Sequence, residues 1–136
     1  LPFSLASIVA QTRKPDEVIV VLKPSGDGSE EVISKFGSEL PLRLVIQEEG
    51  NFTDAVSMAI ANSRGDVIAF LDDDAVAEEK WVEKYMALFA NPRVGGDAVG
   101  FCGSDVGEVE GPAFRPLITL AMLLGTGGNS TPRLNS

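Results

Sequence analysis

Three short apolar runs are the feature that most constrains how this chain can fold. They are rich in β-branched residues and bounded by turn residues, so they predict strands at Glu17–Leu22, Leu42–Gln47 and Asp66–Leu71. Apolar residues at helical spacing lie between them, over residues 29–36 and 52–60. Strands that alternate with helices through right-handed crossovers form a parallel sheet. The sequence therefore predicts an α/β protein with three layers (α/β/α) and a mostly parallel sheet.

Further helices are expected on either side of this core. Leu5 and Ile8 fall on one face of a helix, which predicts that the chain opens in a helical segment. Glu78 and Glu79 are expected to open a later helix, which turns Trp81 and Tyr85 toward the core. All these elements fit one domain that covers residues 1–136.

Local patterns give more detailed expectations for the two central helices. Ser29 is of the residue type that caps helices, so it is expected at the N-cap of the first. In the second, Phe52, Ala55, Ala59 and Ile60 lie on one stripe, and Phe52 is expected to pack against the core.

The last third of the chain is less regular. Residues 98–102 predict another strand, and residues 126–136 are rich in Gly, Asn, Ser and Pro, as loops are. The most apolar stretch, residues 117–124, is too short to span a bilayer. It predicts a buried helix, with a shallow membrane contact as the alternative.

Composition excludes several classes of function. The net charge is −9, and there is no histidine and a single cysteine, Cys102. Non-specific nucleic-acid binding requires clustered Lys and Arg, so no nucleic-acid partner is expected. An ordinary zinc site, a Ser-His or Cys-His dyad and an internal disulfide are also excluded. The chain opens without a basic segment, so no signal peptide is expected, and the cytoplasm is the predicted location.

An acidic cluster stands at a position where α/β proteins bind ligands. Asp72–Asp74 directly follow the third apolar run, and three adjacent like charges repel one another unless water or a cation screens them. In a parallel sheet they share one edge with Lys23–Asp27 and Gln47–Gly50, which follow the first two strands. That edge is the predicted site, with Gln47 and Asp27 as further candidates for substrate binding.

The spacing of the acids suits a divalent cation. Asp72 and Asp74 are two residues apart, so on an extended segment their side chains point to the same side. Mg²⁺ or Mn²⁺ takes one or two carboxylates and leaves its other positions to water and substrate phosphates. Such a cation neutralises the charge of a diphosphate leaving group. The alternative is that these acids only solvate the loop before the next helix.

Short motifs in a fixed order resemble the nucleotide-sugar-binding half of a family 2 glycosyltransferase with the GT-A fold. The matching segments cover nearly the whole chain and include a DxD motif. They are Leu5–Thr12, Pro15–Val21, Ser25–Ser29, Ala61–Asp66, Phe70–Asp74, Trp81-Val82 and Gly127–Arg133.

The resemblance implies roles for the acids. Asp74 would be the main metal ligand, Asp72 would hold the ribose or assist the metal, and Asp73 could share either role. Mn²⁺ or Mg²⁺ would bridge the diphosphate of a nucleotide-sugar donor. The sugar would pass to an acceptor hydroxyl in one in-line displacement that inverts the anomeric centre. A lipid-linked acceptor at the cytoplasmic face of a membrane is common in the resembled family.

Four features depart from the family pattern, so the predicted GT-A domain is a truncated one. The opening strand of the family lacks a counterpart, which predicts a gap with two open strand edges, and a partner strand filling it would give a homodimer. Leu22-Lys23-Pro24 replaces an acid that commonly faces the base. Ser57-Met58-Ala59 stands in place of an "N-x-G" motif. The catalytic base of the family lies beyond Arg133, so no catalytic residue is assigned, and Glu108 and Glu110 are expected to be solvated.

Two alternatives to a glycosyltransferase stay open at this point. One is a catalytically incomplete GT-A-like domain that only binds nucleotide or metal. The other is a small α/β regulatory domain whose acidic edge binds Mg²⁺, although no acid ends its first strand.

Overall fold

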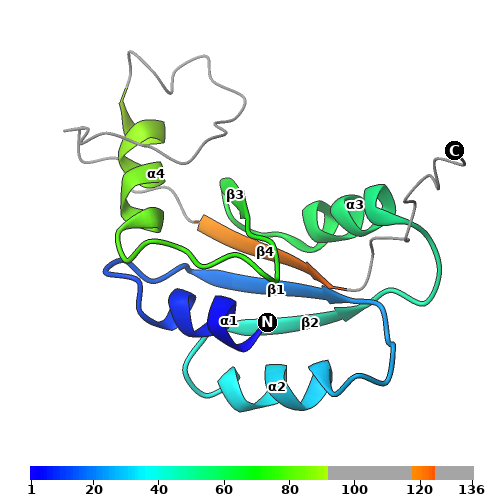
Figure 1. The fold of residues 1–136 in the computed structure, drawn as a ribbon. Coiled ribbons are helices and arrows are strands. Elements are labelled where there is room, and N and C mark those ends of the chain that lie inside the picture. The colour runs from blue at the N-terminus through cyan, green and yellow to red at the C-terminus, as the bar shows by residue number, and fades with distance from the viewer. Residues whose placement is uncertain (92–117, 125–136) are drawn as a thin grey trace, which may run out of the picture.

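The computed structural model describes residues 1–91 and 118–124 (Figure 1). The predicted strand at residues 98–102, Cys102, Glu108, Glu110 and the Gly127–Arg133 motif lie outside these residues. Helices and strands alternate along the chain. They are α1 (Pro2–Val9), β1 (Glu17–Leu22), α2 (Ser29–Phe36), β2 (Leu42–Ile46), α3 (Phe52–Asn62), β3 (Val67–Phe70), α4 (Trp81–Ala90) and β4 (Ile118–Leu124).

The strands form one parallel sheet in the order β2-β1-β4-β3. Figure 1 shows α1 and α2 on one side of the sheet and α3 on the other. The predicted α/β class, the layers and the parallel sheet are confirmed. The strand predicted at Leu42–Gln47 ends one residue earlier than expected, and that predicted at Asp66–Leu71 is one residue shorter at each end.

The prediction of a helix over residues 117–124 is wrong, although its burial is confirmed. These residues form β4, and Ile118–Met122 are all fully buried. A strand covered on both faces is a continuous apolar run, which periodicity alone does not distinguish from a buried helix. Residues 118–124 form a strand because they pair with β1 and β3, which are distant in sequence.

The expected gap between strands is not present in the described part of the chain. β4 pairs with β1 through Glu17↔Thr119 to Leu22↔Leu124 and with β3 through Val67↔Ile118 to Phe70↔Ala121. It therefore covers both edges that we expected to be open. No position between β1 and β3 is left for a strand from a partner chain. A homodimer stays a prediction, but the gap no longer supports it.

Polar side chains fix the start of β4 against β1. The Ile118 amide donates to Asp16 Oδ2 at 2.9 Å, and Thr119 Oγ1 donates to Glu17 Oε2 at 2.9 Å. Arg43 forms an ion pair with Glu17 at 3.2 Å. The residues that make these contacts line a pocket of about 390 Å³ at the amino-terminal ends of the strands. Because it lies at the opposite end of the sheet from the acidic cluster, it is separate from the predicted site.

Alternate residues of the strands build two halves of the core. Val18, Val20 and Leu22 face α1 and α2, whereas Ile19 and Val21 face α3. α4 packs through Val82 and Met86 on β3 and β4, on the same face of the sheet as α1 and α2. Trp81 is half-buried against this core, as expected. The prediction that Glu78 and Glu79 open this helix is wrong, because α4 begins at Trp81 after the N-cap Lys80.

The apolar stripe of α3 is only partly confirmed. Ala55 and Ala59 are fully buried against the sheet, but Phe52 is 52% exposed and Ile60 is 51% exposed. The prediction that Phe52 packs against the core is therefore wrong. The two alanines lie at the centre of the contact with the sheet, and the larger residues lie at its margins.

Candidate functional site

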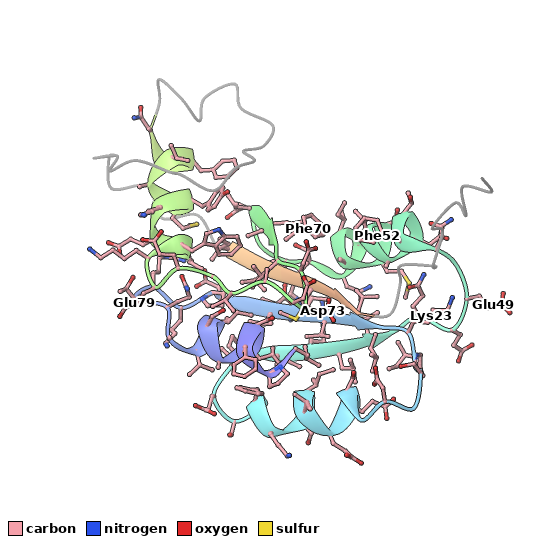
Figure 2. The ribbon with its side chains drawn as sticks, viewed as in Figure 1. Lys23, Glu49, Phe52, Phe70, Asp73 and Glu79 are labelled. Carbon is pink, nitrogen blue, oxygen red and sulfur yellow. The ribbon has the colours of Figure 1, made fainter. Side chains whose placement is uncertain are left out.

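The carboxyl-terminal ends of β1, β2 and β3 bring three loops to one edge of the sheet, as predicted. Figure 2 labels Lys23, Glu49 and Asp73, one residue from each of these loops. Lys23 and Glu49 lie near the tips of β1 and β2, and Asp73 lies closer to α1. In parallel α/β sheets, ligands bind in the crevice outside this edge.

The acidic loop leaves the sheet in a tight turn. Leu71 still donates its amide to the Ala121 carbonyl at 3.1 Å, and Ala75 then donates to the Asp72 carbonyl at 3.1 Å. Asp72 and Asp74 are exposed and Asp73 is half-buried. No hydrogen bond or ion pair among the described residues engages their carboxylates. These oxygens are therefore available to a ligand.

A cage of acids for a metal ion is not found in the described residues. No group of three or more His, Cys, Asp or Glu side chains within residues 1–91 and 118–124 could hold a metal ion. One or two carboxylates suffice where substrate phosphates and water supply the remaining ligands. The acidic loop offers that smaller set.

The buried side of α1 and Gln11, two residues after that helix, contribute residues that sequence analysis treated only as part of a motif. Gln11 is 2% exposed, and its side-chain oxygen accepts a hydrogen bond from the backbone amide of Val82 at 2.9 Å. Ser4 and Ser7 are also buried. The available signal was a polar side chain at residues 4, 7 and 11 of an otherwise apolar segment, a spacing that in a helix repeats on one face.

Lys23 links the loops that follow β1 and β2. Its ammonium donates to the carbonyl of Gly50 at 3.1 Å. The sequence left open whether this residue meets a phosphate or is only solvated. In the structure its ammonium group lies against the loop that precedes α3.

Gln47 is fully buried directly after β2. Its backbone amide donates to the Leu22 carbonyl at 2.9 Å, and its side-chain nitrogen donates to the Asn51 carbonyl at 3.0 Å. Oε1 has no hydrogen-bond partner among the described residues. The side chain thus holds the loop and keeps one buried acceptor unused.

Replacing Gly50 with alanine is expected to cost about 1–3 kcal/mol in backbone strain, because its φ is +106°. The added Cβ would also lie 2.7 Å from Asp54 Oδ2 and 2.9 Å from Gln47 Nε2. Asp54 cannot move freely, since it accepts from the Asn51 amide in the capping box of α3. Urea unfolding of the variant measures the loss.

Gly26→Ala is the matched control for Gly50→Ala. Its φ is +70°, and an added Cβ would meet nothing within 4 Å. It should cost about 1–2 kcal/mol from conformation alone. Equal losses in the two variants would show that the crowding at Gly50 has no effect.

Asp27 has a structural partner. Its carboxylate accepts the Ser29 amide at 3.0 Å, and hydrogen bonds from Ser29 and Ser25 hold its pKa below the ordinary value of 3.8. The prediction that Ser29 is the N-cap of α2 is wrong, because Gly28 with φ +83° takes that position and Ser29 is the first helical residue. Asp27 therefore supports the start of α2.

The stabilising effect of Asp27 is expected to depend on pH. Because its pKa is lower in the folded protein, its contribution is present above pH 3.8 and is lost as the pH falls through the folded-state pKa. The difference in urea midpoint between the wild type and Asp27→Ala should therefore be present at neutral pH and narrow in acid. A constant difference would contradict this assignment.

Comparison with known proteins identifies the family of this chain. The family model described as "Glycosyl transferase family 2" matches residues 1–125. The chain belongs to glycosyltransferase family 2. The four-stranded parallel sheet with flanking helices is consistent with a GT-A type domain, and the resemblance seen in the sequence is confirmed.

Several curated glycosyltransferases are similar to this family 2 chain. "Glucosyl-dolichyl phosphate glucuronosyltransferase" of Haloferax volcanii is 28% identical over 116 residues, which cover 83% of the chain and 36% of the relative. "Glycosyltransferase AglE" of the same organism is 31% identical over 101 residues, or 71% of the chain and 32% of the relative. "Glycosyltransferase GlyA" of Streptococcus pneumoniae is 35% identical over 81 residues, or 58% and 12%.

The chain spans about a third of the length of the Haloferax relatives that it matches. No solved structure gave a significant match. Among the helices of the described residues, none is long and apolar enough to cross a membrane.

Proposed function

We propose that this chain is the donor-binding domain of a glycosyltransferase and binds a nucleoside diphosphate sugar at the carboxyl-terminal edge of its sheet. The exposed carboxylates of Asp72 and Asp74, which have no partner in the described structure, are the observation that carries the proposal. They stand in a loop at the end of β3, in a chain that family 2 matches over residues 1–125. The domain extends over residues 1–136.

A divalent cation fits the donor set of this loop. Asp74 would be its main protein ligand, and Asp72 would assist it or hold the ribose, with Asp73 able to share either role. Mn²⁺ or Mg²⁺, when bound, offsets the negative charge of the diphosphate as the bond to the sugar breaks. The chain itself has a net charge of −9, so an anionic donor gains from such a bridge.

Other residues of the edge support donor binding in different ways. Oε1 of Gln47 has no partner among the described residues and can accept a hydrogen bond from the nucleotide. Because Gln47 is fully buried, the surrounding loop must open for the nucleotide to reach it. Asp27 contributes mainly through the loop before α2, because its carboxylate already accepts the Ser29 amide.

The reaction proposed is transfer to an acceptor hydroxyl in a single in-line displacement, with inversion at the anomeric centre. A relative whose name specifies a glucosyl-dolichyl phosphate supports a lipid-linked acceptor, with another glycan as the alternative. The cytoplasm, or the cytoplasmic face of a membrane, stays the predicted location.

Calorimetric titration tests the proposal. UDP, GDP and their sugar conjugates would be titrated into the folded chain, once with Mn²⁺ and once with EDTA. Binding that requires the metal supports a donor site, and the affinities for UDP and GDP show which nucleotide base the site prefers. Metal-dependent binding without release of sugar would identify a domain that binds but does not catalyse. No binding to the folded chain would contradict a donor site in these residues.

A further inference from the structure

We propose that Ser4, Ser7 and Gln11 are positioning residues, which hold the acidic loop in the geometry that donor binding requires. This inference rests on the proposed function of the loop. The three side chains, called the α1 clamp below, bind backbone atoms of the loop, of α1 and of the first turn of α4, so they would act through the position of the loop and not by touching the donor.

Gln11 joins α1 to the beginning of α4. Its side-chain nitrogen donates to the Glu78 carbonyl at 2.6 Å and to the Ser7 carbonyl at 3.1 Å, and its oxygen accepts from the Val82 amide at 2.9 Å. α4 has no capping hydrogen bond from the side chain of its own N-cap, Lys80. Gln11, two residues after the end of α1, therefore supplies the acceptor that a helix N-terminus needs.

Ser7 and Ser4 extend the clamp toward the acids. Ser7 Oγ accepts from the Ala77 amide at 3.0 Å and donates to the Ser4 carbonyl at 2.7 Å. Ser4 Oγ donates to the carbonyl of Asp73. The contacts thus reach from the acidic turn to the first turn of α4, and all three side chains are buried.

Other contacts also restrain the loop, since the Thr12 amide donates to the Glu79 carbonyl at 2.9 Å and Ala75 and Ala77 pack against the core. Its last backbone contact with the sheet is the bond from Leu71 to Ala121. The carboxylates of the acidic cluster have no partner there and repel one another. Ser4 Oγ reaches the backbone of Asp73 itself, so the α1 clamp bears most directly on where Asp73 and its two neighbours lie relative to the sheet. A reacting or binding group that is misplaced by about 1 Å can lose about 100-fold in effect.

Single hydroxyl deletions test the clamp with little change in volume. Ser4→Ala removes the bond to Asp73, and Ser7→Ala removes the bond to Ala77. Ser57→Ala is the matched control, because Ser57 Oγ also donates to a backbone carbonyl, that of Thr53, but lies exposed on α3. Calorimetry with UDP, GDP and their sugar conjugates in the presence of Mn²⁺ measures affinity, and hydrogen exchange of the amides of residues 72–82 measures the restraint.

We expect Ser4→Ala and Ser7→Ala to bind the best of these nucleotides about tenfold more weakly, the effect of losing one buried hydrogen bond. Amide exchange should accelerate within residues 72–82 and stay unchanged in β1. Ser57→Ala should match the wild type in both measurements. Ser7→Thr, which keeps the hydroxyl, should restore slow exchange and most of the affinity.

Two results would overturn the proposal. One is wild-type affinity in folded Ser4→Ala and Ser7→Ala. The other is faster exchange throughout the sheet, because it would mean that the hydroxyls only stabilise the fold. If the wild type itself binds no nucleotide, the proposed function fails, and with it the role in donor binding. Exchange in residues 72–82 then still decides whether the clamp restrains the loop.

Discussion

Replacing Leu120 with alanine is expected to lower the free energy of unfolding by about 2–5 kcal/mol, as for other large-to-small changes in a core. Leu120 is fully buried at the centre of β4 and pairs with Val18 on one side and Ala69 on the other. Its side chain packs in the core between the sheet and helices α1 and α2, so the cavity would open there. Urea unfolding followed by the fluorescence of Trp81, the single tryptophan, measures the loss.

Leu44→Ala is the matched control for Leu120→Ala. Leu44 is in β2, at the border of the sheet, and is 37% exposed. Its truncation should cost less than about 1 kcal/mol, because it removes less buried surface and leaves no closed cavity. If Leu120→Ala costs no more than Leu44→Ala, residues 118–124 are not the central strand in solution.

Replacing Asp74 with asparagine is expected to weaken metal-dependent binding of a nucleoside diphosphate by at least about 100-fold, since loss of even outer-shell partners costs metal sites about 10–100-fold. Asparagine keeps the size of the side chain and removes its charge. The stability of the fold should not change, because the Asp74 side chain is exposed and has no partner in the described structure. Calorimetry with Mn²⁺ and thermal unfolding without it separate the two effects.

Glu79→Gln is the control for Asp74→Asn. Glu79 is an exposed acid of the same loop, and its carbonyl accepts a hydrogen bond from the Thr12 amide. Losing its charge should leave the affinity near that of the wild type. A similar loss in both variants would mean that the net negative charge of the loop, and not a bond from Asp74, attracts the cation. Unchanged affinity in Asp74→Asn would exclude Asp74 as a main ligand.

The sheet and the acidic edge could be predicted because their signals are local. β-Branched runs gave β1, β2 and β3 to within one residue at each end, and the parallel arrangement followed from the helices between them. The position of Asp72–Asp74 at the end of β3 followed in turn. Their roles as ligands stay predictions, because a strand pattern places a side chain but does not show what it binds.

The parts that escaped prediction depend on contacts between distant segments. β4 is a strand because Ile118–Leu124 meet both β1 and β3, which a local apolar run does not reveal. The α1 clamp was missed because its partners are backbone atoms about 70 residues away, as in the bond from Gln11 to Glu78. The exposed position of Phe52 reflects where α3 begins relative to the sheet, which periodicity does not specify.

The central position of β4 has a consequence for how the protein emerges from the ribosome. β1 and β2 can pair as soon as residue 46 has been made, but β3 has no described neighbour until residues 118–124 are available. Throughout that interval the nascent chain presents unpaired edges of β1 and β3, which are templates for association with other chains. The described sheet is therefore completed only when residues 118–124 have left the ribosome, and a chaperone that shields those edges in the meantime would raise the yield of folded protein.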